Sequence, residues 1–261
     1  MYDQRLVAFV DILGFKNLIE RTVSDPGLVE RVHDMLLSLG TDNVRLESAG
    51  NLNEELIPPE ELAGVREAFD QMSRAMARQA DIRFAYFSDC IVVSAPLANE
   101  MACFLIFELM AEIYVRVFDS YGLLIRGGIA RGAVIHMQSG PLFGPAFVRA
   151  YELESKQARM PRVLLQPDMQ EALSRTGRHR HMLSLFLSQD TETYISLGSS
   201  FRFLANDSSM VFASRPKLLE QYRRALEKAE NLRLETAGLP YADKYSWALA
   251  DLSAVQDDMK A

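Results

Sequence analysis

Two aspartates stand at the ends of short apolar runs, where a carboxylate can meet a ligand at the edge of a sheet. Asp11 lies near the end of the Val-, Ile- and Phe-rich run Arg5–Ile12, and Gly14 and a helical pattern from Phe15 follow at once. A carboxylate beside free backbone amides and a helix N-terminus is suited to hold a metal ion that is bound to phosphates. The alternative is that Asp11 only caps the helix.

The second aspartate, Asp89, lies between the strand patterns 82–88 and 90–95, at a junction too short for a long loop. A lone Asp at such a place is commonly a turn residue. If the N-terminal strand pairs between this hairpin and the later strands, Asp11 and Asp89 meet at one end of the sheet. Two such carboxylates can bridge two divalent cations roughly 3.5–4 Å apart, which is the arrangement of two-metal phosphoryl transfer.

The elements that must position these carboxylates alternate between paired strands and long helices. Strands are expected at 5–12, 82–88, 90–95, 123–130, 132–137 and 161–166, with strand-like pieces at 193–197, 201–204 and 210–212. Helices are expected at 15–21, from Pro26, and at 59–79, 99–119, 145–156, 167–174, 217–236 and 244–255. This order is typical of an α+β fold with helices on one face of a mostly antiparallel sheet.

Composition and charge exclude several classes of function. The chain of 261 residues is 49% apolar and 24% charged, as in soluble globular proteins. Its 35 acidic and 28 basic residues give a net charge of -7, so no nucleic-acid partner is expected. The apolar stretch Met101–Phe118 carries Glu108, Glu112 and Arg116 at four-residue spacing, which predicts an amphipathic helix and no membrane span. The two cysteines form no zinc cluster, and a cytoplasmic location is expected.

Four motifs in order resemble those of the class III nucleotide cyclases, whose core is a ferredoxin-like β-α-β-β-α-β unit. They are Phe9–Phe15, which is similar to the first metal motif of that family, Ser88-Asp89, Arg126–Gly132, and Gly144 followed by Ala150–Ser155. The resemblance covers roughly residues 5 to 166. It implies a ferredoxin-like cyclase core over residues 1–175, with 40–64 as an insertion or loop, and a C-terminal extension over 176–261 packed on the core.

Departures from the family pattern affect the substrate. The family carries an Asn and an Arg on the helix after the glycine, where this chain has Val148 and Glu152. The residues that read a purine base are replaced by Ala85 and Pro141. Either the enzyme is inactive, or it acts on a different base with relocated residues.

A narrower resemblance favours the second reading. The motifs Leu142–Ala146, Ala150–Ser155 and Asp243–Trp247 are similar to those of the pyrimidine cyclases of the bacterial Pycsar anti-phage system. This resemblance implies a homodimer with shared active sites that converts UTP, or alternatively CTP, to a 3′,5′-cyclic monophosphate and diphosphate. It further implies two divalent cations, Mn²⁺ or Mg²⁺, and a product that activates a separate effector protein.

The resemblance also implies roles for single residues. Asp11 and Asp89 are the expected catalytic metal ligands, the Ile12 carbonyl is an expected extra ligand, and backbone amides are expected to hold the β- and γ-phosphates. These amides belong to Leu13, Gly14, Phe15 and Lys16.

Other basic residues have two open interpretations. Strand alternation places Arg83 on the face of the second aspartate, where it reads the pyrimidine or a phosphate, or is a solvated edge charge. Arg149, Lys156 and Arg162 are candidates to replace the absent transition-state arginine, or are surface charges, and Glu154 could pair with one of them.

Two rival functions follow from the same residues. One is a catalytically inactive cyclase-like module that binds a nucleotide and dimerises, supported by Val148 and Glu152. The other is a different phosphoryl-transfer enzyme, such as a cyclic-dinucleotide synthase or a polymerase-like domain. That class is disfavoured because the motif Gly-Gly-Asp-Glu-Phe is absent and Phe-Ser-Asp stands at the hairpin.

Overall fold

The computed structural model describes residues 1–38, 57–137, 139–167, 169, 180–206 and 215–260. The strands are β1 (Asp3–Leu13), β2 (Arg83–Phe87), β3 (Cys90–Pro96), β4 (Leu124–His136), β5 (Leu142–Phe143), β6 (Val163–Leu165), β7 (Leu187–Gln189) and β8 (Glu192–Ile195). The α-helices are α1 (Phe15–Thr22), α2 (Pro26–Ser38), α4 (Pro59–Ala80), α5 (Glu100–Tyr121), α6 (Pro145–Glu152), α8 (Leu197–Asn206), α9 (Arg215–Glu235), α10 (Ala242–Ala254) and α11 (Gln256–Lys260). A π-helical turn, Leu153–Gln157, continues α6, and a 3₁₀ helix spans Arg180–Leu185.

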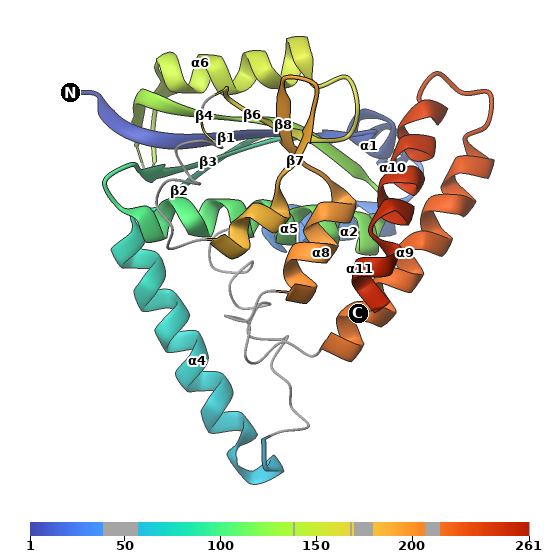
Figure 1. The fold of residues 1–261 in the computed structure, drawn as a ribbon, viewed down its shortest axis with the longest axis horizontal. Coiled ribbons are helices and arrows are strands. Elements are labelled where there is room, and N and C mark those ends of the chain that lie inside the picture. The colour runs from blue at the N-terminus through green and yellow to red at the C-terminus, as the bar shows by residue number, and fades with distance from the viewer. Residues whose placement is uncertain (39–56, 138, 168, 170–179, 207–214, 261) are drawn as a thin grey trace.

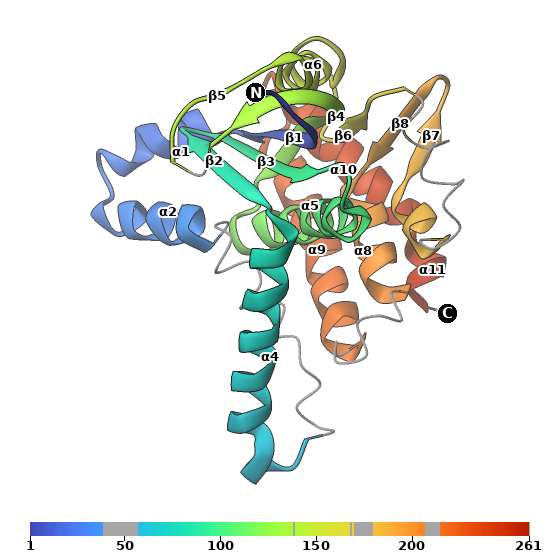
Figure 2. The same ribbon diagram turned by 90° about the vertical axis from the view of Figure 1, so that its left-hand side faces the viewer.

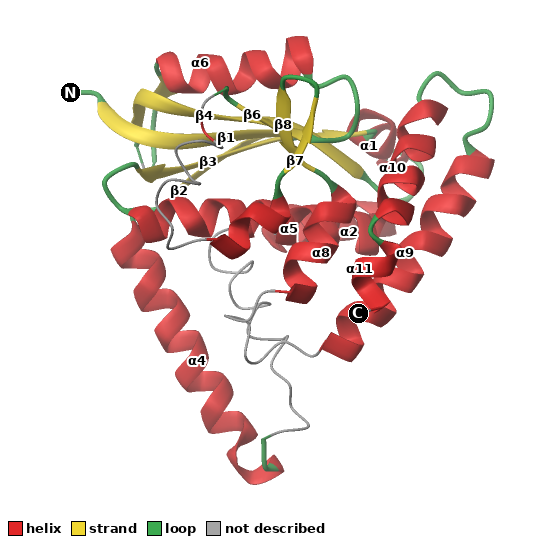
Figure 3. Cartoon of the chain, viewed as in Figure 1, coloured by secondary structure: helices red, strands yellow, loops and turns green. Residues whose placement is uncertain are grey.

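The strands form one sheet in the order β2-β3-β1-β4-β6-β8-β7, and β5 pairs with β4 (Figure 3). Among the described strands only β4 and β6 pair in parallel. In this register Asp11 faces Cys90 of β3 on one side and Arg126 of β4 on the other. The order of the strands therefore brings three chemically active side chains to one end of the sheet.

Strand β1 occupies the centre because its side chains are apolar in both directions. Leu6, Ala8 and Val10 pack into the large core beneath the sheet, while Val7 and Phe9 pack into a smaller core on the other face. Alternate side chains of a strand point to opposite faces, so a continuous apolar run is stable only where both faces are covered.

Helices cover both faces of this sheet. Helix α5 lies along one face with α8 packed against it, and α6 lies on the opposite face (Figure 1). Helices α9 and α10 pack against each other at one end of the molecule (Figure 1), and α4 projects away from the sheet (Figure 2). No helix among the described residues has the length and apolar character needed to cross a membrane.

The mixed α+β class and the mostly antiparallel sheet are as predicted, and three local predictions need correction. Helices cover both faces, because α6 packs on β1 and β4 opposite α5. The ranges 123–130 and 132–137 are one strand, because both halves continue the same pairing with β1. The predicted loop 40–64 overlaps the predicted helix 59–79, and the overlap is helical: α4 begins at Pro59, as expected for that helix, at a position where a missing N–H costs nothing.

The range 201–204 is also helical where a strand was expected. It lies within α8, whose N-terminus is capped by Ser196: the Ser196 hydroxyl accepts a hydrogen bond from the amide of Ser199 at 3.1 Å. A strong N-cap outweighs the β propensity of the two phenylalanines that follow it.

The boundary between the predicted core and its extension falls outside the described residues, as do the strand-like piece 210–212 and most of the predicted helix 167–174. Strands β7 and β8 continue the sheet beyond β6. The division into a core of residues 1–175 and an extension of residues 176–261 stays a proposal.

Candidate active site

The predicted pair of aspartates meets at one corner of the sheet. Asp11 lies near the end of β1, and Asp89 lies in the two-residue turn between β2 and β3, where Ser88 has a φ of 58°. The Ile12 amide donates to the Asp89 carbonyl at 3.0 Å, which ties the turn to β1. Ligand atoms of Asp11, Asp89 and Cys90 all lie within 4.8 Å of one another. The two carboxylates are therefore close enough to share a cation.

The backbone of Ile12 lies beside the hairpin that carries Asp89. Within a strand, the N–H and C=O of one residue point to the same side. Because the Ile12 amide bonds to the Asp89 carbonyl, the Ile12 carbonyl faces the same hairpin. The side chain of Ile12 is buried in the core and takes no part in the corner.

Burial makes this corner unfavourable for the negative charge that it carries. The Asp11 side chain is 16% exposed, and this burial raises the pKa of its carboxyl. The positive charge of Arg126 lowers that pKa, and the negative charge of Asp89 raises it further, so that the pKa is raised overall. Burial and the neighbouring carboxylates raise the pKa of the Cys90 thiol to about 12, so that thiol is protonated at neutral pH. A divalent cation between the two carboxylates would relieve this repulsion.

Arg126 and Glu154 complete the corner, although neither was predicted to be a site residue. Arg126 Nη2 lies 3.3 Å from Asp11 Oδ2, and Arg126 Nε lies 2.6 Å from Glu154 Oε1. Glu154 is buried, and burial raises its pKa while Arg126 lowers it. The signal was present in the motif that begins at Arg126, but only the pairing register shows that this residue faces Asp11.

A glycine allows Glu154 to reach Arg126. Gly128 lies two residues beyond Arg126 on β4, and a Cβ there would meet the Ala150 carbonyl oxygen at 2.2 Å and Leu153 Cβ at 2.5 Å. Without a side chain at this position, α6 and the π-helical turn pack directly on the strand. This close approach brings Glu154 over the end of β4.

The expected phosphate-binding segment follows the corner directly. Gly14, with a φ of 86°, turns the chain from β1 into α1, and its carbonyl accepts from the Leu18 amide at 3.2 Å. Phe15 is buried and fixes the start of the helix, whereas Lys16 is exposed and lies 3.9 Å from Glu20. The N-terminal turn of α1, together with Leu13 at the end of β1, thus lies next to the carboxylates in the chain.

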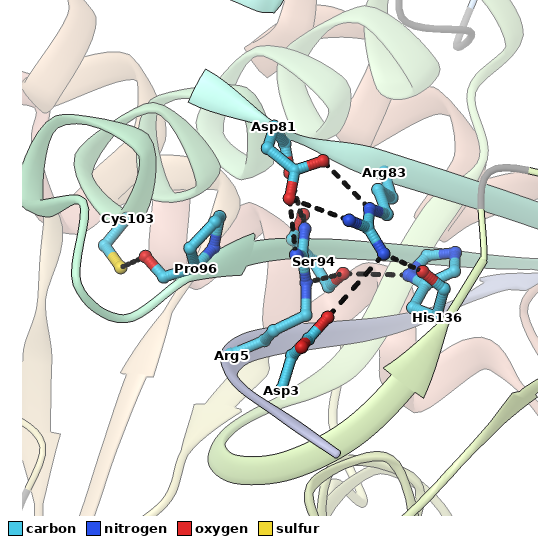
Figure 4. A network of polar contacts seen from close by, with 8 residues as sticks. All are labelled: Asp3, Arg5, Asp81, Arg83, Ser94, Pro96, Cys103 and His136. Atoms are coloured by element: carbon cyan, nitrogen blue, oxygen red, sulfur yellow. Dashed lines mark hydrogen bonds and ion pairs between the residues drawn. The ribbon is translucent and has the colours of Figure 1, made fainter. Parts of the chain in front are cut away.

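Arg83 is not part of this corner. It lies at the opposite end of β2 from the turn, where its guanidinium bonds to Asp81 and to the His136 carbonyl and lies 3.8 Å from Asp3 (Figure 4). Buried Arg5 contacts the same Asp81 carboxylate at 2.8 Å. Strand alternation gives the face of the sheet on which a residue lies and not its distance along the strand, so it could not show that Arg83 lies at the other end of β2 from Asp89.

The three basic candidates for the transition state have other partners in this structure. The Arg149 guanidinium donates to the Arg131 carbonyl, and Lys156 pairs with Glu152 at 2.6 Å on the surface. Arg162 pairs with Glu192, and its guanidinium carbon lies 4.8 Å from the Tyr194 ring centroid. Glu154 pairs with Arg126 and with none of these three.

Comparisons with known proteins give distant structural neighbours. No protein-family model matches the sequence, and no curated protein matches it. The chain is similar to the catalytic core of a rhodopsin-guanylyl cyclase with converted specificity in complex with ATPαS, at 14% identity and a TM-score of 0.43, over 74% of this chain and 94% of that chain. It is similar to the monomeric guanylyl cyclase domain of a fusion protein from the aquatic fungus Blastocladiella emersonii, at 17% identity and a TM-score of 0.41, over the same shares.

A third neighbour is a bacterial light-regulated adenylyl cyclase, at 14% identity and a TM-score of 0.35, over 86% of this chain and 99% of that chain. These structural neighbours are guanylyl and adenylyl cyclases.

Proposed function

We propose that this chain is a pyrimidine nucleotide cyclase, a lyase that converts UTP to 3′,5′-cyclic UMP and diphosphate. The observation that carries the proposal is the meeting of Asp11 and Asp89 at a partly buried corner, with ligand atoms within 4.8 Å. Their position beside the N-terminus of α1 matches what a nucleoside triphosphate with its cations requires.

The residues of the corner fit divalent cations. Carboxylate and carbonyl oxygens are preferred by Mg²⁺ and Mn²⁺, and Asp11, Asp89 and the Ile12 carbonyl supply them. When bound, two such ions would acidify the ribose 3′-hydroxyl and neutralise charge on the triphosphate. The raised pKa of Asp11 supports the fit, because the burial and the Asp89 charge behind it are what a cation offsets.

The chain's own contribution is positioning. Asp11 and Asp89 would hold the cations that accompany the triphosphate, and the amides from Leu13 to Lys16 would hold its β- and γ-phosphates. The substrate's 3′-hydroxyl gives up its proton to solvent, its oxygen forms a bond to the α-phosphorus, and the bond between the α-phosphorus and the diphosphate leaving group breaks. Since nucleophile and electrophile belong to one molecule, holding them in line supplies much of the rate.

The base preference and the biological role rest on the narrower sequence resemblance. Ala85 and Pro141 offer no hydrogen-bonding side chain where purine cyclases read the base. We favour UTP, with CTP as the alternative substrate. The cyclic product would be a second messenger for anti-phage defence that acts on a separate effector protein.

We also propose a homodimer with shared active sites. The α6 face of the sheet carries apolar side chains that are about half exposed in the single chain: Phe87, Phe143, Val148 and Tyr151. Apolar groups gathered on one face favour burial against a partner. A monomer with full activity at working concentration would contradict this proposal.

Product analysis tests the activity directly. The full chain is incubated with each of the four ribonucleoside triphosphates and Mn²⁺, and products are identified by mass spectrometry. We expect cyclic UMP, or cyclic CMP, and none from Asp11→Asn or Asp89→Asn. Asp190→Asn is the matched control, because Asp190 also lies in a two-residue hairpin turn, between β7 and β8. No cyclic product from any nucleotide contradicts the proposal.

One observation favours a second function, that of an inactive nucleotide-binding module. Glu152, which stands where related cyclases carry the transition-state arginine, is ion-paired with Lys156 on the surface. Stabilisation of the fold by UTP and Mn²⁺ without any turnover would select this module over the enzyme.

A further inference from the structure

Arg126 is shared between two carboxylates and is well placed for neither. Its Nη2 lies 3.3 Å from Asp11 Oδ2, which is long for a charge-assisted hydrogen bond. Its Nε lies 2.6 Å from Glu154 Oε1, but the two atoms are not aligned as a hydrogen bond. The guanidinium thus has a compromise position between an outer carboxylate, which belongs to the proposed cation site, and an inner one.

We propose that Arg126 is a built-in counter-ion that occupies the cation's place at Asp11, and that cation binding displaces it toward Glu154. The inference rests on the proposed function, because it concerns the cation site of Asp11 and Asp89. It assigns Arg126 a positioning and regulatory role: the guanidinium sets how tightly the corner binds its metal.

Glu154 is suited to be the anchor of this exchange. Its side chain is 5% exposed and comes from the π-helical turn, which Gly128 allows to rest on β4. A buried carboxylate needs a partner, so Glu154 retains Arg126 when a cation takes Asp11. Release from Asp11 would let the guanidinium align fully with Glu154, which partly offsets the lost contact.

The charges at the corner also favour competition between Arg126 and a divalent cation for Asp11. Asp11 and Asp89 lie together in a corner whose burial already penalises charge, and within the described part of the chain Arg126 is the basic side chain in contact with Asp11. A divalent ion and a guanidinium compete for the same carboxylate oxygen, so each lowers the affinity of the site for the other.

The test measures Mn²⁺ binding to the full chain at pH 8 without nucleotide. The electron paramagnetic resonance signal of free Mn²⁺ reports how much of the metal stays unbound. We expect Arg126→Gln to bind Mn²⁺ about tenfold more tightly, since one unit charge at this distance and a surface-like dielectric is worth at least that factor. Arg126→Lys keeps the positive charge, and its affinity for Mn²⁺ should lie between those of the wild type and Arg126→Gln. Arg131→Gln, on the same strand, is the matched control and should bind as wild type does.

A second variant covers the risk that Arg126→Gln leaves Glu154 unpaired and unfolds the chain. Arg126→Gln combined with Glu154→Gln removes one positive and one negative charge, so its matched reference is Glu154→Gln alone. These two variants differ only by the guanidinium charge, and the double variant should bind Mn²⁺ about tenfold more tightly than Glu154→Gln does. Adding Asp11→Asn to either Arg126→Gln variant should abolish the increase in Mn²⁺ affinity. A merely structural Arg126 predicts the opposite sign, because a disordered corner binds Mn²⁺ more weakly.

The outcomes separate this inference from the proposed function. Unchanged or weaker Mn²⁺ binding in the folded Arg126 variants overturns the counter-ion role, even if the wild type makes a cyclic nucleotide. Tighter Mn²⁺ binding together with no cyclic product from the wild type supports the counter-ion role and contradicts only the cyclase.

Discussion

Replacing Gly128 with alanine tests how α6 is seated on the sheet. The added Cβ would lie 2.2 Å from the Ala150 carbonyl oxygen, and ordinary contact begins at 3.4 Å, so α6 must move outward by about 1.2 Å. Overpacking of a closed core costs about 1–3 kcal/mol. Because the obstacle is backbone and has no rotamer to change, we expect the upper half of that range.

The expected effect reaches stability and the site together. A loss of 2–3 kcal/mol lowers the melting temperature of a chain of this size by about 5–10 °C. The same displacement draws Glu154 away from Arg126, which are now 2.6 Å apart, and so disturbs the corner. Urea unfolding followed by circular dichroism gives the free energy of unfolding, and Mn²⁺ binding reports on the corner.

The matched control is Gly64→Ala in α4. A Cβ at Gly64 meets nothing within 4 Å, so alanine should raise the free energy of unfolding by about 0.5–1 kcal/mol through helix propensity. If Gly128→Ala is as stable as the wild type to within about 0.5 kcal/mol, the direct packing of α6 on β4 is refuted.

Three further predictions address pH, specificity and metal. Burial raises the pKa of Asp251, which accepts from the Gly198 amide at 2.7 Å, to about 6, above the ordinary 3.8. The folded state therefore holds this proton more tightly than the unfolded chain, and the free energy of unfolding falls as pH rises from about 4 to 6. Asp251→Asn should remove this component, and a pH-independent difference between variant and wild type in urea titrations would contradict it. Arg83→Gln should leave the KM for UTP unchanged, because Asp81 holds this guanidinium at the far end of β2. A higher KM for UTP in this variant would show that Arg83 takes part in binding the nucleotide. Mn²⁺ at a hundred times its dissociation constant should raise the free energy of unfolding by about 2.7 kcal/mol, reversibly with chelator, and equal stabilisation of Asp11→Asn would place the metal elsewhere.

Local patterns predicted most elements and failed where local signals conflicted. The long helix was expected at 99–119 and spans Glu100–Tyr121, where the Asn99 side chain accepts from the Ala102 amide at 3.1 Å. The range 201–204 was expected to be a strand, yet Ser196 starts a helix there. An N-cap acts on the whole helix that follows it, whereas β propensity depends on neighbours that a local window does not contain.

The choice of charged residues around the corner shows the limit more sharply. Arg83, Arg149, Lys156 and Arg162 were candidates by type and spacing, and each has a partner other than the two aspartates. Arg126, which contacts Asp11, was noted only as part of a motif. Residue type and strand parity identify a face of the sheet, but the distance along that face depends on the pairing register.

By itself, the sequence determined which residues could carry charge at the end of a strand, and that Asp11 and Asp89 belong to segments that end close to turns. Only the tertiary structure decided that these two carboxylates meet, since β1 had to pair between β3 and β4. It also decided that Arg126 and Glu154 join them, because a glycine on β4 lets a helix approach the strand directly. Contacts between residues far apart in the chain follow from strand order and from the space left by missing side chains, and neither is written in any local stretch of sequence.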